Sequence, residues 1–181
     1  MDNHIYTLPA IEDMPRLSSA ERATILDKLF EPSSQLQFLC LPLLHGVSLP
    51  DYNTLVQIIK VRLGALLNSS DNDEISRLDD VLRSHPRLGE SKVESAQSRA
   101  EQAQLQSSDS DQVQELAETN ALYEKQFPGL RYVVFVNGRP RSEILKDMQF
   151  RIDRNNIKQE RLDAIQAMCD IALDRACRLT S

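Results

Sequence analysis

Apolar residues recur at intervals of three and four over most of the chain, which is the spacing that places side chains on one face of an α-helix. Ser18 and Glu21 form an S-x-x-E capping pattern at the start of the first such stretch, and Pro32 ends it. The predicted buried stripes are Ile25, Leu26, Leu29 and Phe30; Leu55, Ile58, Ile59, Leu63, Leu66 and Leu67; Ile75, Leu78, Val81 and Leu82; Ile144, Leu145, Met148 and Ile152; and Leu162, Ile165, Met168, Cys169, Ala172, Ala176 and Leu179.

Further helices are predicted between these stripes. Residues 36–44 are rich in leucine but contain Pro42, which favours a short helix pressed into the core. A helix is expected from Ser91 to about Leu105, with Ser91 and Glu94 as its capping box. Residues 106–112 lack apolar periodicity and predict a mobile connection, after which residues 113–123 predict another helix.

The segment Tyr132–Val136 contains the β-like run of the chain, made of β-branched and aromatic residues. A partner strand of similar quality is missing from the sequence nearby, so the segment is expected to be extended without forming a sheet. We find no internal repeat and no long linker. The predicted fold is therefore all-α, a single compact bundle of about seven to nine helices in one domain over residues 1–181.

Composition agrees with a helical globular protein. The chain has 181 residues, of which 41% are hydrophobic and 27% charged, and 5 glycines leave little material for the turns of a sandwich or barrel. The net charge of -6 disfavours binding to a phosphate backbone. Cys40, Cys169 and Cys177 cannot all pair with one another, and they are predicted to be buried thiols in a reducing compartment.

Targeting signals are not apparent in the sequence. The chain lacks an apolar run of about 20 residues and a basic-then-apolar start, so a soluble, intracellular protein without a membrane partner is expected. Its last residues, Arg178 to Ser181, do not match the Ser-Lys-Leu peroxisomal signal.

The most informative polar residues for chemistry lie in two short segments. The chain has no glycine-rich phosphate loop, no nucleophile elbow and no cluster of cysteine and histidine with metal-ligand spacing. His85 lies between a predicted helix end near Ser84 and Pro86, where a stiff backbone would project an imidazole able to exchange a proton near neutral pH. The alternative is a surface histidine beside a turn, the interpretation that we also give His4 and His45.

The second segment contains Ser98, Glu101 and Gln102, at spacings of three and four that bring their side chains onto one helical face. A hydroxyl, a carboxylate and an amide together suit the ureido and carbonyl groups of a ligand. The alternatives are a solvated polar face or a second capping box from Ser98 to Glu101. A site requires that His85 and Glu101 converge on one small cavity.

Taken together, His85-Pro86-Arg87-Leu88-Gly89 and, thirteen residues after the histidine, Ser98-Arg99-Ala100-Glu101-Gln102 resemble the motifs of the 2-oxo-4-hydroxy-4-carboxy-5-ureidoimidazoline (OHCU) decarboxylases, HP-x-L and S-x-x-E-Q. The resemblance extends to Leu8-Pro9, to the segment from Asn120 to Val136 and to Arg151, Asn155 and Glu160 near the end. The chain differs from the family in having no tryptophan, and it has Arg131 where the family's F-G-F-P-F-V segment would place a proline.

The resemblance implies an all-helical, homodimeric enzyme that needs no cofactor or metal and converts its small-molecule substrate to (S)-allantoin in urate catabolism, in the cytoplasm or the peroxisome. It implies that His85 and Glu101 are catalytic and that Arg151 pairs with the carboxylate of the substrate. Further contacts with the substrate are implied for Pro86, Ser98, Gln102, Tyr132, Val133, Val134, Phe135 and Val136. The alternatives are a catalytically silent helical scaffold that binds a partner protein and, less favoured by the charge, a nucleic-acid binder.

Overall fold

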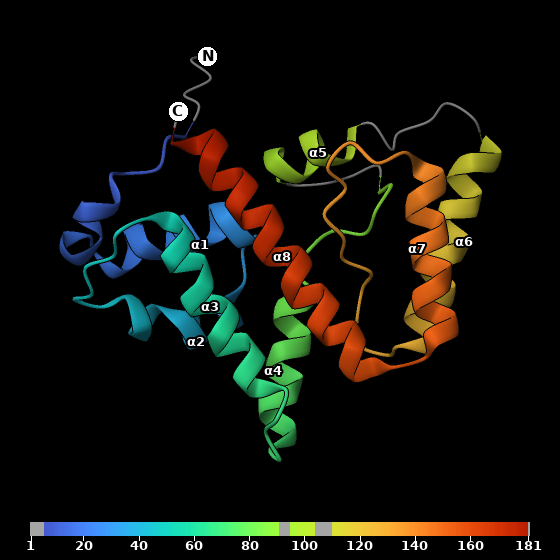
Figure 1. The fold of residues 1–181 in the computed structure, drawn as a ribbon, viewed down its shortest axis with the longest axis horizontal. Helices are drawn as coiled ribbons and strands as arrows, with labels where there is room; N and C mark the ends of the chain where they lie inside the picture. Colours follow the sequence, from blue (N-terminus) through green and yellow to red (C-terminus); the bar gives the residue numbers. More distant parts are fainter. Residues whose placement is uncertain (1–5, 91–94, 104–109, 181) are drawn as a thin grey trace.

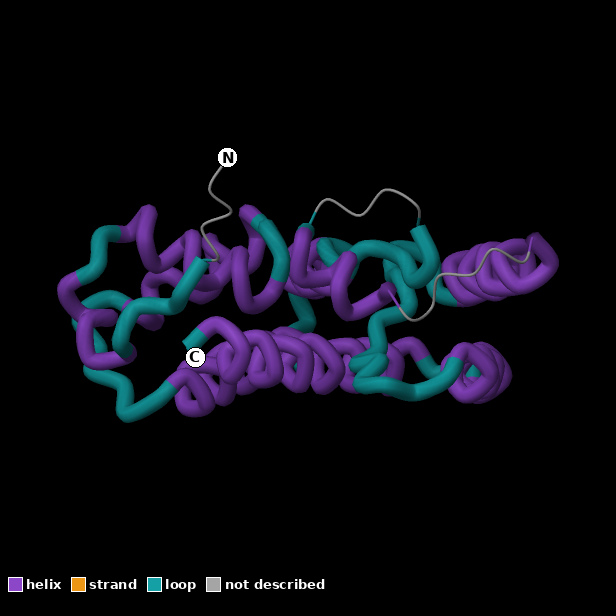
Figure 2. Tube along the Cα trace, turned by 90° about the horizontal axis from the view of Figure 1, so that it is seen from above, coloured by secondary structure: helices purple, strands orange, loops and turns teal. Residues whose placement is uncertain are grey.

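The computed structural model describes residues 6–90, 95–103 and 110–180, and this part of the chain is built from helices and loops without a strand (Figures 1 and 2). The all-α class and the predicted number of helices are therefore confirmed. The elements are the 3₁₀ helices η1 (Ile11–Arg16) and η2 (Leu41–Leu44) and the α-helices α1 (Ser19–Phe30), α2 (Ser34–Cys40), α3 (Tyr52–Leu66), α4 (Asn72–Leu82), α5 (Ala96–Gln102), α6 (Ser110–Gln126), α7 (Arg141–Arg154) and α8 (Ile157–Leu179).

Side-chain caps begin most of these helices. At α1 the backbone N–H of Glu21 donates to Ser18 Oγ over 3.2 Å, and the N–H of Ser18 donates to Glu21 Oε2 over 2.7 Å, so the predicted capping box is confirmed. Each such cap satisfies a backbone donor that the helix itself leaves unpaired. Five other helices have an N-cap side chain that accepts such a hydrogen bond: Ser33 at α2, Asp51 at α3, Asp71 at α4, Ser95 at α5 and Asn156 at α8.

Helix α8 crosses the middle of the molecule and organises the core (Figure 1). It packs against α1, α3 and α4, and its buried stripe includes Ile165, Met168 and Ala172, as the periodicity predicts. The two termini of the described chain meet at its end, where the N–H of Leu8 donates to the carbonyl of Leu179 over 2.8 Å. None of the described helices is long and apolar enough to span a bilayer.

Helices α6 and α7 form a pair at the other end of the molecule, and the segment that joins them runs back toward α8 (Figure 1). Within this segment Tyr132–Val136 is neither helix nor strand, which agrees with the predicted lack of a sheet. Arginine side chains hold its carbonyl groups instead. Arg151 Nη1 donates to Val133 over 3.1 Å, and Arg139 Nη2 donates to Phe135 over 2.6 Å.

The structure tests three further predictions, on the helix after Ser91, on the connection before α6 and on the cysteines. The helix expected from Ser91 is seen as α5, which begins after Ser95, while the proposed Ser91–Glu94 capping box lies outside the described residues. Helix α6 begins at Ser110, so a mobile connection through residue 112 is wrong at its end, and residues 106–109 lie outside the described part. Cys40 and Cys169 are buried, but Cys177 is exposed because it lies on the outer face of α8.

A glycine brings the loop after α4 against α6. Gly89 has a φ of +78°, and a Cβ added there would lie 2.6 Å from Cδ2 of Leu116, which is itself buried and has little room to move. Gly46 also has a positive φ, of +68°, but no atom lies within 4 Å of the position of its Cβ. Substitutions at both glycines cause backbone strain, but only a substitution at Gly89 also causes a close contact.

We expect Gly89→Ala to lower the free energy of unfolding by about 2–4 kcal/mol, because strain and overpacking add at this position. Gly46→Ala should cost only about 1 kcal/mol, from strain alone. Urea denaturation of both variants measures the difference. Equal losses would show that Leu116 can yield and that the loop is not held by this contact.

Candidate active site

A cavity of about 230 Å³ lies where the loop after α4, helix α5, the segment before α7 and the C-terminal half of α8 meet. Most of the predicted site residues line it, and they come from three separate segments of the sequence. Those lining it are His85, Pro86, Ser98, Glu101, Gln102, Tyr132, Val133, Val134, Phe135 and Val136. Helix α8 adds Ile171, Asp174 and Arg178, which sequence reasoning did not propose.

The imidazole of His85 is buried, with 4% of the residue exposed, and its Nε2 has no hydrogen-bond partner among the described residues. Burial and, to a smaller extent, the nearby charge of Arg175 lower the pKa of His85 to about 4 against the opposing effects of Glu31 and Glu101. His85 is therefore neutral at pH 7. A neutral imidazole can accept a proton but cannot begin a reaction as a strong acid.

Side chains from three directions hold the loop that carries His85. Gln102 Oε1 accepts from the backbone N–H of Gly89 over 2.9 Å, and Asn120 Nδ2 donates to the carbonyl of Leu88 over 3.0 Å. Arg131 Nη1 donates to the carbonyl of Arg83 over 3.2 Å and to that of His85 over 3.4 Å. The histidine is therefore presented by a fixed backbone.

Glu101 is held by two arginines of α8. Arg175 donates from Nε and Nη2 to the two carboxylate oxygens over 2.7 and 2.8 Å, and Arg178 Nη2 donates over 2.9 Å. Burial alone would raise the pKa of Glu101, but the hydrogen bonds and charges of both arginines outweigh it and the pKa is lowered. The structure shows no hydrogen bond between His85 and Glu101, so the carboxylate acts on the imidazole through its charge.

Behind the cavity, Arg175 and Glu31 form a buried ionic cluster with Ser98. Arg175 is 1% exposed, and its Nη2 donates to Glu31 Oε1 over 2.7 Å and to Ser98 Oγ over 3.0 Å. Ser98 Oγ in turn donates to Glu31 Oε1 over 2.5 Å. Sequence reasoning missed both ionic residues, although Arg175 gives a signal, since it lies on the apolar stripe of α8 between Ala172 and Ala176.

Arg151 does not line this cavity. It is buried on α7, where its Nε donates to Glu160 Oε2 over 2.8 Å and its Nη1 donates to the carbonyl of Val133. Its guanidinium carbon also lies 4.7 Å from the ring centre of Tyr132. Arg151 therefore supports the wall of this cavity from behind, and it lines a neighbouring cavity that shares Val134 and Phe135. Its Nη2 has no hydrogen-bond partner among the described residues, and its pairing with a ligand carboxylate stays a prediction.

The cavity offers a defined set of polar groups. The N–H groups of Val133, Val134 and Phe135 have no hydrogen-bond partner among the described residues, and the amide nitrogen of Gln102 is likewise uncommitted there. These are donors for ligand oxygens, and Glu101 and Ser98 supply acceptors for N–H groups. The described residues contain no group of three or more acidic, histidine or cysteine side chains placed to hold a metal ion.

Comparison with known proteins identifies a family and a similar fold. The family described as OHCU decarboxylase matches residues 15–177 of the chain. A crystal structure of an (S)-allantoin synthase is similar in fold, with a TM-score of 0.58 and 19% sequence identity, over 94% of this chain and 54% of that one. The chain thus spans about half the length of that protein. Among curated proteins, no sequence matches significantly.

The burial of His85 makes the stability of the fold depend on pH. The unfolded chain binds a proton at this residue below its ordinary pKa of about 6.5, whereas the folded chain does so only near 4. Between these values the unfolded state holds more protons, so stability falls as the pH is lowered. We expect His85 to account for a loss of about 3 kcal/mol between pH 7 and pH 4.

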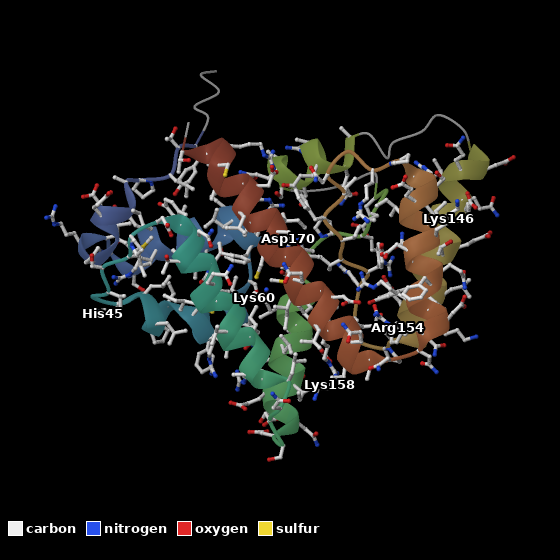
Figure 3. All side chains as sticks on the ribbon, in the orientation of Figure 1. His45, Lys60, Lys146, Arg154, Lys158 and Asp170 are labelled. Carbon is white, nitrogen blue, oxygen red and sulfur yellow. The ribbon has the colours of Figure 1, made fainter. Side chains whose placement is uncertain are left out.

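Urea unfolding at pH 7 and pH 4.5 measures how much unfolding free energy is lost as the pH falls. The contribution of His85 is the difference between the loss in the wild type and the smaller loss in His85→Gln. His45→Gln is the control, because His45 is exposed and lies at the end of the molecule away from α6 and α7 (Figure 3). The same loss in the wild type and in His85→Gln would contradict a buried, neutral His85.

Proposed function

The chain belongs to the OHCU decarboxylase family, and on that premise we propose that it converts 2-oxo-4-hydroxy-4-carboxy-5-ureidoimidazoline to (S)-allantoin in the cavity beside α5. The observation that carries the proposal is the convergence of His85, Ser98, Glu101 and Gln102 on that one cavity. A silent scaffold of the same fold has no use for a buried imidazole whose Nε2 lacks a described partner.

The proposed substrate is an anion with ring and ureido N–H groups and several carbonyl oxygens. Its oxygens match the backbone N–H groups of Val133 to Phe135 and the amide of Gln102, and its N–H groups match Glu101 and Ser98. Among the described residues that line the cavity, Arg178 is the one with a permanent positive charge, and its side chain is 44% exposed. Arg178 therefore takes the place that the sequence assigned to Arg151 as partner of the carboxylate.

The reaction needs no electron acceptor beyond the substrate. When the bond to the carboxylate carbon breaks, CO₂ leaves and the electron pair moves into the neighbouring ring imine, which takes up one proton. The product of this step is an enol. Moving the hydroxyl proton of the enol to the adjacent ring carbon then gives allantoin, and delivery to one face of that carbon sets the S configuration.

His85 is suited to this second transfer. As a neutral base it accepts the proton of the hydroxyl group, and as the resulting imidazolium it returns a proton to the carbon. Glu101, held ionised by Arg175 and Arg178, binds substrate N–H and stabilises the imidazolium through its negative charge. His85 thus both accepts and delivers a proton, and acceptance comes first.

The proposal includes a homodimer in the cytoplasm or the peroxisome, acting on a small molecule and not on nucleic acid. The net charge of -6 supports the proposal that the protein does not act on nucleic acid, because a negative surface repels the phosphate backbone. Light scattering of the purified chain measures the dimer directly.

Removing the imidazole should abolish most of the catalysis. We expect His85→Ala to lower kcat by about 10²–10⁴, the usual contribution of a general acid–base group. The freshly made product of urate oxidation is supplied, and the appearance of (S)-allantoin is followed by its ellipticity. His45→Ala serves as the matched control and should behave as the wild type, and equal rates for wild type, His85→Ala and buffer would reject the enzyme.

The pH dependence of kcat/KM tests the role of the neutral imidazole. Because the pKa of His85 is lowered to about 4, kcat/KM should stay constant from pH 8 down to about 5 and fall as the pH approaches 4. Circular dichroism at each pH separates this fall from unfolding. A midpoint near 6.5, the value of an unperturbed histidine, would contradict the proposed resting state.

A further inference from the structure

Glu31, the first residue after α1, has a strained backbone. Its φ of 77° and ψ of 150° lie in a region that is adopted almost exclusively by glycine. Pro32 accounts for the extended ψ, since a residue before proline is restricted to such values, but it does not account for the positive φ. A glycine here would remove the strain, so the glutamate side chain must supply something that offsets it.

The carboxylate of Glu31 is buried, with 4% of the residue exposed, and it points into the polar cluster behind the cavity. Its Oε1 accepts from Ser98 Oγ over 2.5 Å and from Arg175 Nη2 over 2.7 Å, and Arg175 Nη2 also reaches Ser98 Oγ at 3.0 Å. Three elements far apart in the sequence therefore meet at one oxygen atom: the end of α1, the face of α5 and the last turns of α8.

These contacts fix the direction of the Ser98 hydroxyl. A paired carboxylate can only accept hydrogen bonds and a guanidinium can only donate them. The hydroxyl hydrogen of Ser98 must therefore point to Glu31, and one lone pair of its oxygen must face Arg175. The lone pair that remains is the one group that Ser98 can offer to a ligand, so toward the cavity Ser98 is an acceptor.

We propose that Glu31 is a positioning residue that makes Ser98 an obligatory hydrogen-bond acceptor and so selects an N–H group of the ligand at that point of the cavity. The inference rests on the proposed function for the identity of the ligand, in which the ureido group provides such N–H donors. It adds to that function a specificity determinant that does not itself line the cavity.

The same carboxylate influences the other end of the site. Arg175 lies between Glu31 and Glu101, and its guanidinium also donates over 3.4 Å to the carbonyl of Leu29, two residues before the strained Glu31. Loss of Glu31 would leave Arg175 with one carboxylate in place of two. It would also remove a negative charge that opposes the lowering of the pKa of His85.

The test is a double-mutant cycle that measures binding of (S)-allantoin, which retains the ureido group, by calorimetry. Glu31→Gln can donate from its amide and no longer fixes the hydroxyl, so the Kd should rise about tenfold. Ser98→Ala should raise the Kd by a similar factor. If Glu31 acts through Ser98, the double variant should bind about tenfold more weakly than the wild type and not a hundredfold, since the two effects are not independent.

Two further variants keep the result interpretable. Glu31→Gly suits the backbone conformation and lacks the carboxylate, so it should fold and show the same weakened binding even if Glu31→Gln does not fold. Glu143→Gln, at an exposed position on α7, is the matched control and should bind as the wild type. Wild-type affinity in Glu31→Gly, or effects of Glu31→Gln and Ser98→Ala that multiply, would overturn the proposal.

A readout without ligand separates this proposal from the proposed function. The titration midpoint of His85, measured by NMR, should be lower in Glu31→Gly than in the wild type, because a nearby negative charge has been removed. An unchanged midpoint would contradict the placement of Glu31 in this cluster. A wild-type chain that neither binds (S)-allantoin nor produces it would instead contradict the proposed function, whatever the titration shows.

Discussion

The guanidinium of Arg175, buried between two carboxylates, is the interaction on which the site depends. It joins Glu31 at the end of α1 to Glu101 on α5 and to the core helix α8 that carries it. A buried charge is tolerated only when its partners are in place, and removal of one member of such a group typically costs about 3–5 kcal/mol. The position of α5, a helix of 7 residues, is therefore set by charge more than by apolar contact.

This cluster also determines the chemistry that the cavity can support. Arg175 and Arg178 keep Glu101 ionised, while burial and the charge of Arg175 keep His85 neutral. At pH 7 both groups are thus held in their deprotonated forms, Glu101 as a fixed anion and His85 as a free base. The anion can bind N–H groups, and the free base can accept a proton.

The helices and their buried stripes could be predicted because the period of apolar residues is a local property of the sequence. The convergence of His85, Ser98, Glu101 and Gln102 could be predicted only through the two motifs, since no periodicity relates a loop to the next helix. Glu31 could not be found, because a glutamate before a proline at a helix end is normally solvated.

The two buried arginines can be recognised from the helical pattern of the sequence. Arg175 lies three residues after Ala172 and seven after Met168, and Arg151 lies three after Met148 and seven after Ile144, so each occupies the apolar face of its helix. A cation at such a position must have a buried partner. The family resemblance related Arg151 to the ligand, and nothing in the pattern identified Arg175 as a site residue. The position of such a cation in a helix shows that a buried partner exists, but it does not show which residue that partner is.

The segment from Arg131 to Val136 shows how the cavity keeps its shape without a sheet. A sheet would engage both the N–H and the C=O groups of these residues, whereas Arg151 and Arg139 engage carbonyl groups and leave neighbouring N–H groups without described partners. Arg131, which replaces the proline of the family pattern, donates to the carbonyl of His85. A proline could not make this bond. The arginine therefore connects the segment that forms the cavity wall to the loop that carries His85. Side-chain hydrogen bonds, and not a β-sheet, fix the position of the two segments relative to each other.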